Sequence, residues 1–121
     1  MAIAAAIVAA LIHVWFFAME SLWFMRPTVW RRFGLASQEE AEVVQTFAFN
    51  QGFYNLFLAV GVAAGLALVA MGDVVGGRAI VLFACASMIA AGIVLFRFNP
   101  RGAVLQAVPP LIAVAAIIFL G

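Results

Sequence analysis

The stretch AIAAAIVAALIHVWFFAMESLWFM, residues 2–25, decides the class of fold, because it is an apolar run long enough to cross a bilayer. One helical crossing of the hydrocarbon core needs about 20 predominantly apolar residues. The run lacks a basic start and carries His13 and Glu20, unlike the apolar region of a cleaved signal peptide. We therefore interpret it as a retained first transmembrane helix.

Three further apolar stretches follow, so that the predicted spans are residues 3–25, 43–71, 79–96 and 103–120, with an interfacial loop at 26–42. Hydrophobic residues make up 69% of the 121 residues and charged residues 9%, against about 45–50% and about 25% in soluble domains. Short connections make consecutive helices antiparallel neighbours. The sequence predicts one all-α domain, an integral membrane four-helix bundle of antiparallel up-down topology in a lipid bilayer.

The arginines predict the orientation of this bundle. Arg78 lies in the second connection, whereas the first and third connections hold the other five. Arginine-rich connections stay on the cytoplasmic side of a membrane. We therefore expect a multi-pass protein of the cell inner (plasma) membrane with both termini outside and loops one and three in the cytoplasm. The chain has no basic stripe that would indicate a nucleic-acid partner. The five arginines are Arg26, Arg31, Arg32, Arg97 and Arg101.

Two local signals bear on helix starts and turns. Ser37-Gln38-Glu39-Glu40 reads as a capping box, in which the Ser37 hydroxyl accepts from the Glu40 amide, so the second helix is predicted to start near Gln38. Gly76-Gly77-Arg78 reads as a turn outside the membrane.

Small residues and the lone cysteine have plain interpretations. Gly61 and Gly65 form a GxxxG pattern that permits close helix approach, either within the bundle or between protomers. Cys85 has no partner for an intrachain disulfide, and no cluster of residues indicates a metal site. We predict no metal and no cofactor.

Polar side chains within the spans are the unusual feature, because an acidic group at mid-helix costs about 2.5–3.5 kcal/mol on insertion. His13 and Glu20 are seven residues apart and share one helix face. With Met25 level with Val43, Glu20 would lie opposite Ala48, and His13 opposite Asn55. We predict a polar pocket in the cytoplasmic half of the bundle. Its ligand-binding residues would be His13, Glu20, Asn50, Gln51, Tyr54, Asn55 and Gln106.

The last helix contributes Gln106 next to Pro109-Pro110. Proline lacks an amide hydrogen, so carbonyl groups one turn earlier lose their helical partners and become acceptors near Gln106. Glu20 would be protonated in this apolar setting or balanced by a neighbour such as His13, Arg97 or Arg101.

These residues coincide with the motifs of a family of small four-span membrane proteins. The chain resembles the "domain of unknown function 1304" family over essentially its whole length. The resemblance implies the four-helix architecture and supplies no activity. It rests on His13 and Glu20, Phe33-Gly34-Leu35, Asn50-Gln51-Gly52-Phe53-Tyr54-Asn55 with Phe57-Leu58-Ala59, and Gln106 with Pro109.

Three functions remain open from the sequence. The first is binding or transport of a small molecule, with Glu20 as charge carrier or cation partner. The second is a non-catalytic accessory subunit of a larger membrane complex, or a homo-oligomer. The third is an enzyme on a lipid-soluble substrate, with His13 or Glu20 as acid or base. No nucleophile–base pair stands at a telling spacing, so we predict no catalytic residues and lean away from an enzyme.

Overall fold

The computed structural model describes all 121 residues, and its regular elements are all helical. Four helical segments are long and apolar enough to cross a membrane, as predicted: α1 with the π-helix η1, then α3, α4 and α5. This confirms the all-helical fold. The bounds are α1 Ala2–Phe17, η1 Ala18–Leu22, α2 Pro27–Trp30, the 3-10 helix η2 Arg31–Phe33, α3 Gln38–Ala70, α4 Val74–Phe96 and α5 Pro100–Leu120.

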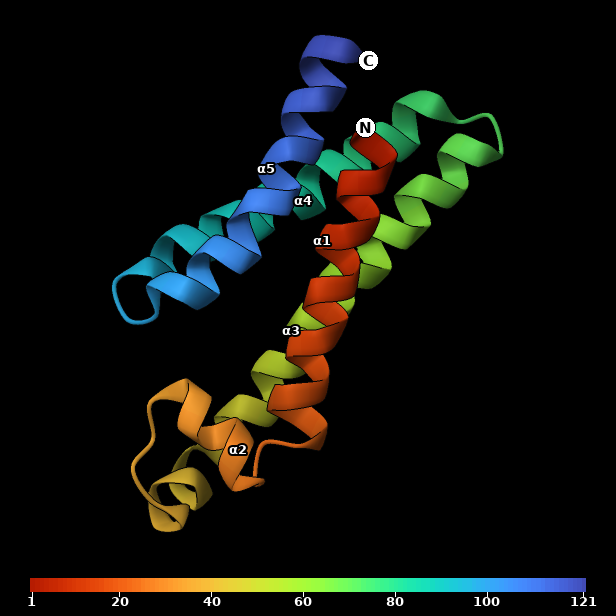
Figure 1. Ribbon diagram of the computed structural model, residues 1–121. Coiled ribbons are helices and arrows are strands. Elements are labelled where there is room, and N and C mark those ends of the chain that lie inside the picture. The colour runs from red at the N-terminus through yellow and green to blue at the C-terminus, as the bar shows by residue number, and fades with distance from the viewer.

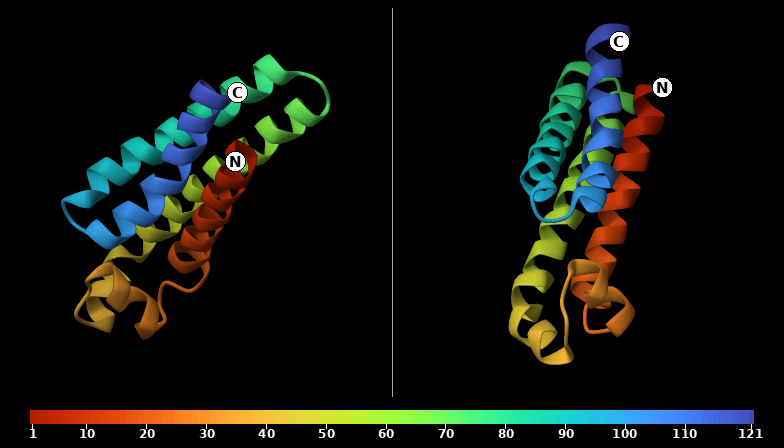
Figure 2. Two further views of the ribbon diagram at one scale, coloured as in Figure 1. Left: turned by 45° about the horizontal axis from the view of Figure 1, so that its top comes forward. Right: turned by 60° about the vertical axis from the view of Figure 1, so that its left-hand side comes forward.

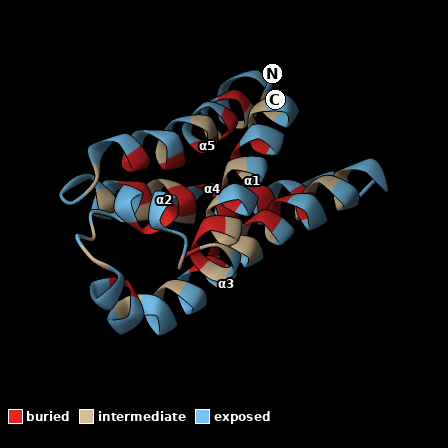
Figure 3. Cartoon of the chain, turned by 60° about the horizontal axis from the view of Figure 1, so that its bottom comes forward, coloured by how far each residue is buried: buried red, intermediate tan, exposed pale blue.

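The four long helices form a closed ring, because α3 packs against α1 and α4, and α5 packs against α4 and α1. Both chain ends lie at one end of the bundle, and the α2 segment lies at the other (Figures 1 and 2). Buried positions gather on helix sides that face one another (Figure 3). Half of them are alanine or glycine, which lets the backbones approach closely. The main core holds Ala6, Ala9, Val62, Val81, Ala84, Cys85, Met88 and Ala113.

The start of α3 agrees with the capping signal. The Ser37 hydroxyl accepts from the Glu40 amide at 3.2 Å, which confirms a helix start at Gln38. The Glu40 carboxylate accepts from the Ala36 amide at 2.7 Å, one residue before the usual partner. Trp30 Nε1 donates to Gln38 Oε1 at 2.9 Å and ties the α2 segment to the foot of α3.

The turn between α3 and α4 lies earlier than predicted. Gly72 adopts the left-handed region with φ 101°, and the Asp73 carboxylate accepts from the Gly76 amide at 2.9 Å. A left-handed glycine ends one helix and an aspartate N-cap begins the next. The prediction of a turn at Gly76-Gly77-Arg78 is therefore wrong, because these residues belong to the first turns of α4.

The two glycines of the GxxxG pattern have different surroundings. A Cβ on Gly65 would lie 2.7 Å from Val81 Cγ2 and 2.8 Å from the Gly77 oxygen, whereas a Cβ on Gly61 would meet only Ala84 Cβ at 3.6 Å. Gly65 therefore serves the contact of α3 with α4 inside the bundle.

Substitution by alanine is expected to affect stability differently at the two glycines. Gly65→Ala overpacks the α3–α4 contact and should lower the free energy of unfolding by about 1–3 kcal/mol. Gly61→Ala makes an ordinary van der Waals contact and should change it by less than about 0.5 kcal/mol. Unfolding of the purified variants in mixed micelles by a denaturing detergent measures both values. Equal losses for the two variants would show that Gly65 has no special packing role.

Candidate functional site

Glu20 lies in an irregular part of the first span. The α-helix ends at Phe17, and Ala18–Leu22 form one turn of π-helix, closed by a hydrogen bond of 2.9 Å from the Trp23 amide to the Ala18 oxygen. Single π-turns inside helices occur frequently at functional sites. The π-turn also changes the helical phase between His13 and Glu20, which the sequence placed on one regular face.

A hydrogen bond across helices holds the Glu20 side chain. Asn55 Nδ2, in α3, donates to Glu20 Oε1 at 2.9 Å. Glu20 is 8% exposed and Asn55 is 3% exposed, so bilayer and bulk water are both largely excluded from this contact. A carboxylate offers about four lone-pair positions, and Asn55 takes one of them. The carboxyl group therefore retains acceptor capacity for a further partner.

Gly52 allows α3 to approach η1 at this level. A Cβ on Gly52 would overlap Ser21 Oγ and would lie 3.0 Å from the Ser21 nitrogen and 3.1 Å from Glu20 Cβ. Ser21 Oγ in turn donates to the Phe49 oxygen at 2.7 Å. This close contact fixes which residues of α3 face Glu20.

The predicted register of the first two spans is therefore wrong by about one turn. Glu20 packs against Gly52 and bonds to Asn55, rather than lying opposite Ala48. Asn55 is thus the partner of Glu20 and not of His13. The physical reason is that the chain leaves the helix after Leu22, so Met25 belongs to the connection and does not mark the end of a regular span.

A cavity of about 460 Å³ lies beside Glu20, between the first span and α3 on one side and the junction of α4 with α5 on the other. Glu20 is the only ionisable residue among the 12 that line it. Three aromatic residues contribute apolar wall: Phe16, Phe33 and Phe98. Four carboxamides share the lining with them: Gln51, Asn55, Asn99 and Gln106.

Five of the seven residues predicted for the pocket lie within the bundle or on this lining. Glu20, Gln51, Asn55 and Gln106 line the cavity, and His13 is fully buried. The structure does not bring Asn50 and Tyr54 to the cavity, since both are exposed on the outer side of α3. Tyr54 is 58% exposed and packs edge-on against Phe57.

His13 is buried and makes no hydrogen bond to Glu20. Its Nδ1 donates to the Ala9 oxygen at 2.8 Å, so Nδ1 carries the proton, because a carbonyl can only accept. The Nε2 atom is buried without a protein partner. The ring packs edge-on against Phe16, with centroids 5.8 Å apart, and Phe16 lines the cavity. His13 thus supports the cavity wall from behind.

Asn99 and Phe98 line the cavity although the sequence interpretation missed them. Asn99 Oδ1 accepts from the Gly102 amide at 3.0 Å and caps α5. The sequence did contain the signal for this cap, because an asparagine before a proline and an apolar run indicates a helix start. Its position beside Gln51 and Glu20 depends on how the helices pack.

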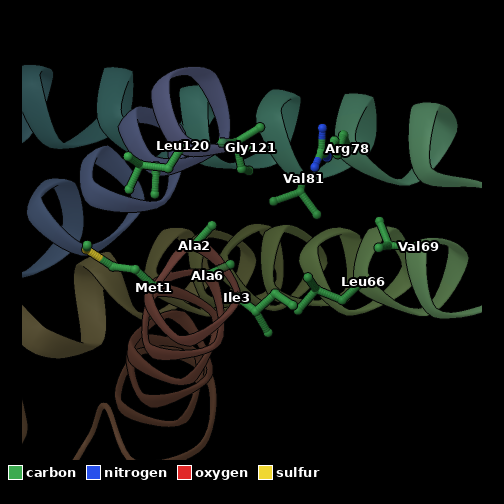
Figure 4. Close-up of a pocket in the computed structure, with 12 residues that line it drawn as sticks. Met1, Ala2, Ile3, Ala6, Leu66, Val69, Arg78, Val81, Leu120 and Gly121 are labelled. Carbon is green, nitrogen blue, oxygen red and sulfur yellow. The ribbon is translucent and has the colours of Figure 1, made fainter.

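A second cavity, of about 310 Å³, lies at the end of the bundle that holds the chain termini (Figure 4). Ten of its 12 lining residues are hydrophobic, and Arg78 supplies the one charged side chain. None of the polar residues predicted from the sequence reaches it. The candidate site is therefore the cavity beside Glu20.

These features define the class: a membrane protein built as a helical bundle, with a carboxyl group and several carboxamides on the wall of a cavity between its helices. The chain belongs to the family described as protein of unknown function (DUF1304), whose model matches residues 7–118. This confirms the resemblance. No curated protein and no solved structure matches the chain.

Proposed function

We propose that the protein binds a small organic cation in the cavity beside Glu20, as a binding or transport protein of the membrane. One observation supports this function most directly: Glu20 is the single ionisable residue on the cavity wall. An ionisable side chain within a membrane span requires a partner that balances it or faces water. A bound cation supplies that balance and leaves the hydrogen bond from Asn55 in place.

The rest of the wall suits such a ligand. The wall includes the aromatic residues Phe16 and Phe33, and aromatic rings attract organic cations and accommodate their apolar parts. The carboxamides of Gln51 and Gln106 can orient polar groups on the ligand. A volume of about 460 Å³ falls within the range of about 300–1,000 Å³ that small-molecule sites occupy.

The orientation belongs to the same proposal. Phe33 in the first connection, and Phe98 and Asn99 in the third, lie at the cavity. Five of the six arginines lie in these two connections, so the positive-inside rule favours a cytoplasmic position for this end. We propose that the protein resides in the inner (plasma) membrane and takes its ligand from the cytoplasmic side.

Glu20→Gln is expected to abolish cation binding while the protein stays folded. A panel of small amines, such as benzylamine and butylamine, is tested by thermal unfolding in detergent against the alcohols of the same shape. A ligand at 100 times its Kd stabilises the native state by about 2.7 kcal/mol. We expect amines to stabilise the wild type. Their stabilising effect on Glu20→Gln should be at least tenfold weaker.

Glu39→Gln provides the matched control, because Glu39 is an exposed acidic residue in the first turn of α3. This variant should respond to amines as the wild type does. Equal stabilisation by amines and alcohols, or an unchanged amine response in Glu20→Gln, would overturn the proposal.

A further inference from the structure

A third cavity, a groove, lies on the outer side of the bundle between α1 and α5. Its volume is about 750 Å³, the largest of the cavities described. Its walls along α1 and at Leu105 of α5 are apolar. Val8, Leu11 and Leu105 on these walls are 46%, 63% and 55% exposed, so they face the lipid. Arg32 and Arg101 line this groove and Glu20 does not, so it differs from the cavity beside Glu20, although the two share Phe16, Phe33, Asn99 and Gly102.

Two arginines lie at one end of the groove. Arg32 belongs to η2 in the first connection and Arg101 to the first turn of α5, and both line the hollow. Three other arginines of these connections lie over aromatic rings nearby in the chain: Arg26 over Trp23, Arg31 over Trp30 and Arg97 over Phe98. The groove therefore joins a lipid-facing apolar channel to a pair of positive charges from separate segments.

We propose that this groove binds an acidic phospholipid, with the phosphate between Arg32 and Arg101 and an acyl chain along α1. Guanidinium groups match phosphate oxygens with paired hydrogen bonds. Basic pockets between transmembrane helices on the cytoplasmic side bind anionic headgroups. The charge of the groove end thus selects the acidic lipids over the zwitterionic ones.

The length of the groove fits one leaflet. Its wall on the first span runs from Val8 to Met19, and a helix covers these eleven residue-to-residue steps in about 17 Å. Half of a hydrocarbon core of about 30 Å is about 15 Å. An acyl chain whose headgroup sits at the arginines therefore matches the apolar wall from end to end.

Native mass spectrometry of the purified full chain tests the proposal with dioleoyl phosphatidylglycerol and dioleoyl phosphatidylcholine, which share their acyl chains. The test variant is R32Q/R101Q. The matched control is R31Q/R97Q, which removes two charges from the same connections outside the groove. We expect the wild type and the control to bind one phosphatidylglycerol per chain at least tenfold more tightly than phosphatidylcholine. R32Q/R101Q should lose this preference.

A second variant keeps the test decisive if R32Q/R101Q does not fold. Leu11→Trp fills the apolar part of the groove and leaves both arginines in place, so it should weaken phosphatidylglycerol binding at least fivefold. The proposal would be overturned if R32Q/R101Q and R31Q/R97Q lost the preference for phosphatidylglycerol equally. It would also be overturned if Leu11→Trp bound phosphatidylglycerol as the wild type does. Inorganic phosphate that displaces the lipid at equal concentration would also overturn it, by showing a site for free phosphate. Glu20→Gln should bind phosphatidylglycerol normally, which separates this site from the cation site.

Discussion

Replacing Asn55 by leucine is expected to lower the free energy of unfolding by about 2–3 kcal/mol, because Glu20 loses the donor that holds its carboxyl group. Leucine has nearly the shape of asparagine but cannot donate a hydrogen bond to Glu20. A buried polar group without its partner costs about 1–3 kcal/mol, and more if it is charged. Unfolding by a denaturing detergent, followed by circular dichroism, measures this loss directly.

A double-mutant cycle separates the lost hydrogen bond from changes in packing. In a Glu20→Leu background, Asn55→Leu should cost less than in the wild type by at least about 1 kcal/mol, because the residues are in contact. Asn50→Leu is the matched control, since Asn50 lies on the same helix and is exposed. A cost for Asn50→Leu as large as that for Asn55→Leu, or strict additivity in the cycle, would contradict the described contact.

Gly52→Ala is expected to destabilise the protein by about 3 kcal/mol, near the top of the range for overpacked contacts. The added Cβ overlaps Ser21 Oγ, and the neighbouring backbone nitrogen of Ser21 leaves it little room to move. Alanine is otherwise the better helix former by about 1 kcal/mol, so any loss underestimates the steric conflict. Unfolding in detergent measures the loss of stability, and amine binding should weaken as well, because the contact also positions Glu20.

Ser21→Ala combined with Gly52→Ala distinguishes this conflict from a general intolerance of substitution. Removal of the hydroxyl relieves the shortest overlap, so the double variant should regain at least about 1 kcal/mol relative to Gly52→Ala alone. Gly61→Ala supplies the control in the same helix, where a Cβ has an ordinary neighbour at 3.6 Å. No recovery in the double variant would mean that Ser21 is not the obstacle.

The apolar runs were sufficient to predict four long helices, since only helices and closed barrels satisfy the backbone within a bilayer, and runs of about 20 apolar residues match a helical crossing and not a barrel strand. Local capping signals were equally readable, as at Ser37, because both partners lie within three residues. The π-turn at Ala18–Leu22 was not predictable in this way. It accompanies the close packing of Ser21 on Gly52, which joins segments far apart in the sequence.

The candidate site was predicted only in part for a related reason. Polar residues such as Asn50, Gln51, Tyr54 and Asn55 occupy more than one side of α3, so their spacing cannot tell which side faces inward. Packing decides this: Gly52 and Asn55 face the first span, whereas Asn50 and Tyr54 face outward. Asn99 was overlooked because its nearest sequence neighbours indicate a cap and not a cavity.

A high-resolution structure of the protein purified from native membranes tests the cation site most directly. We expect non-protein density in the cavity, with a positively charged group in contact with the Glu20 carboxylate and the hydrogen bond from Asn55 intact. The contrary result is a closed cavity, in which the carboxamides of Gln51 and Gln106 fold onto Glu20 and leave no space. In that case the buried polar residues would serve to pack the helices, and the proposed cation site would be wrong.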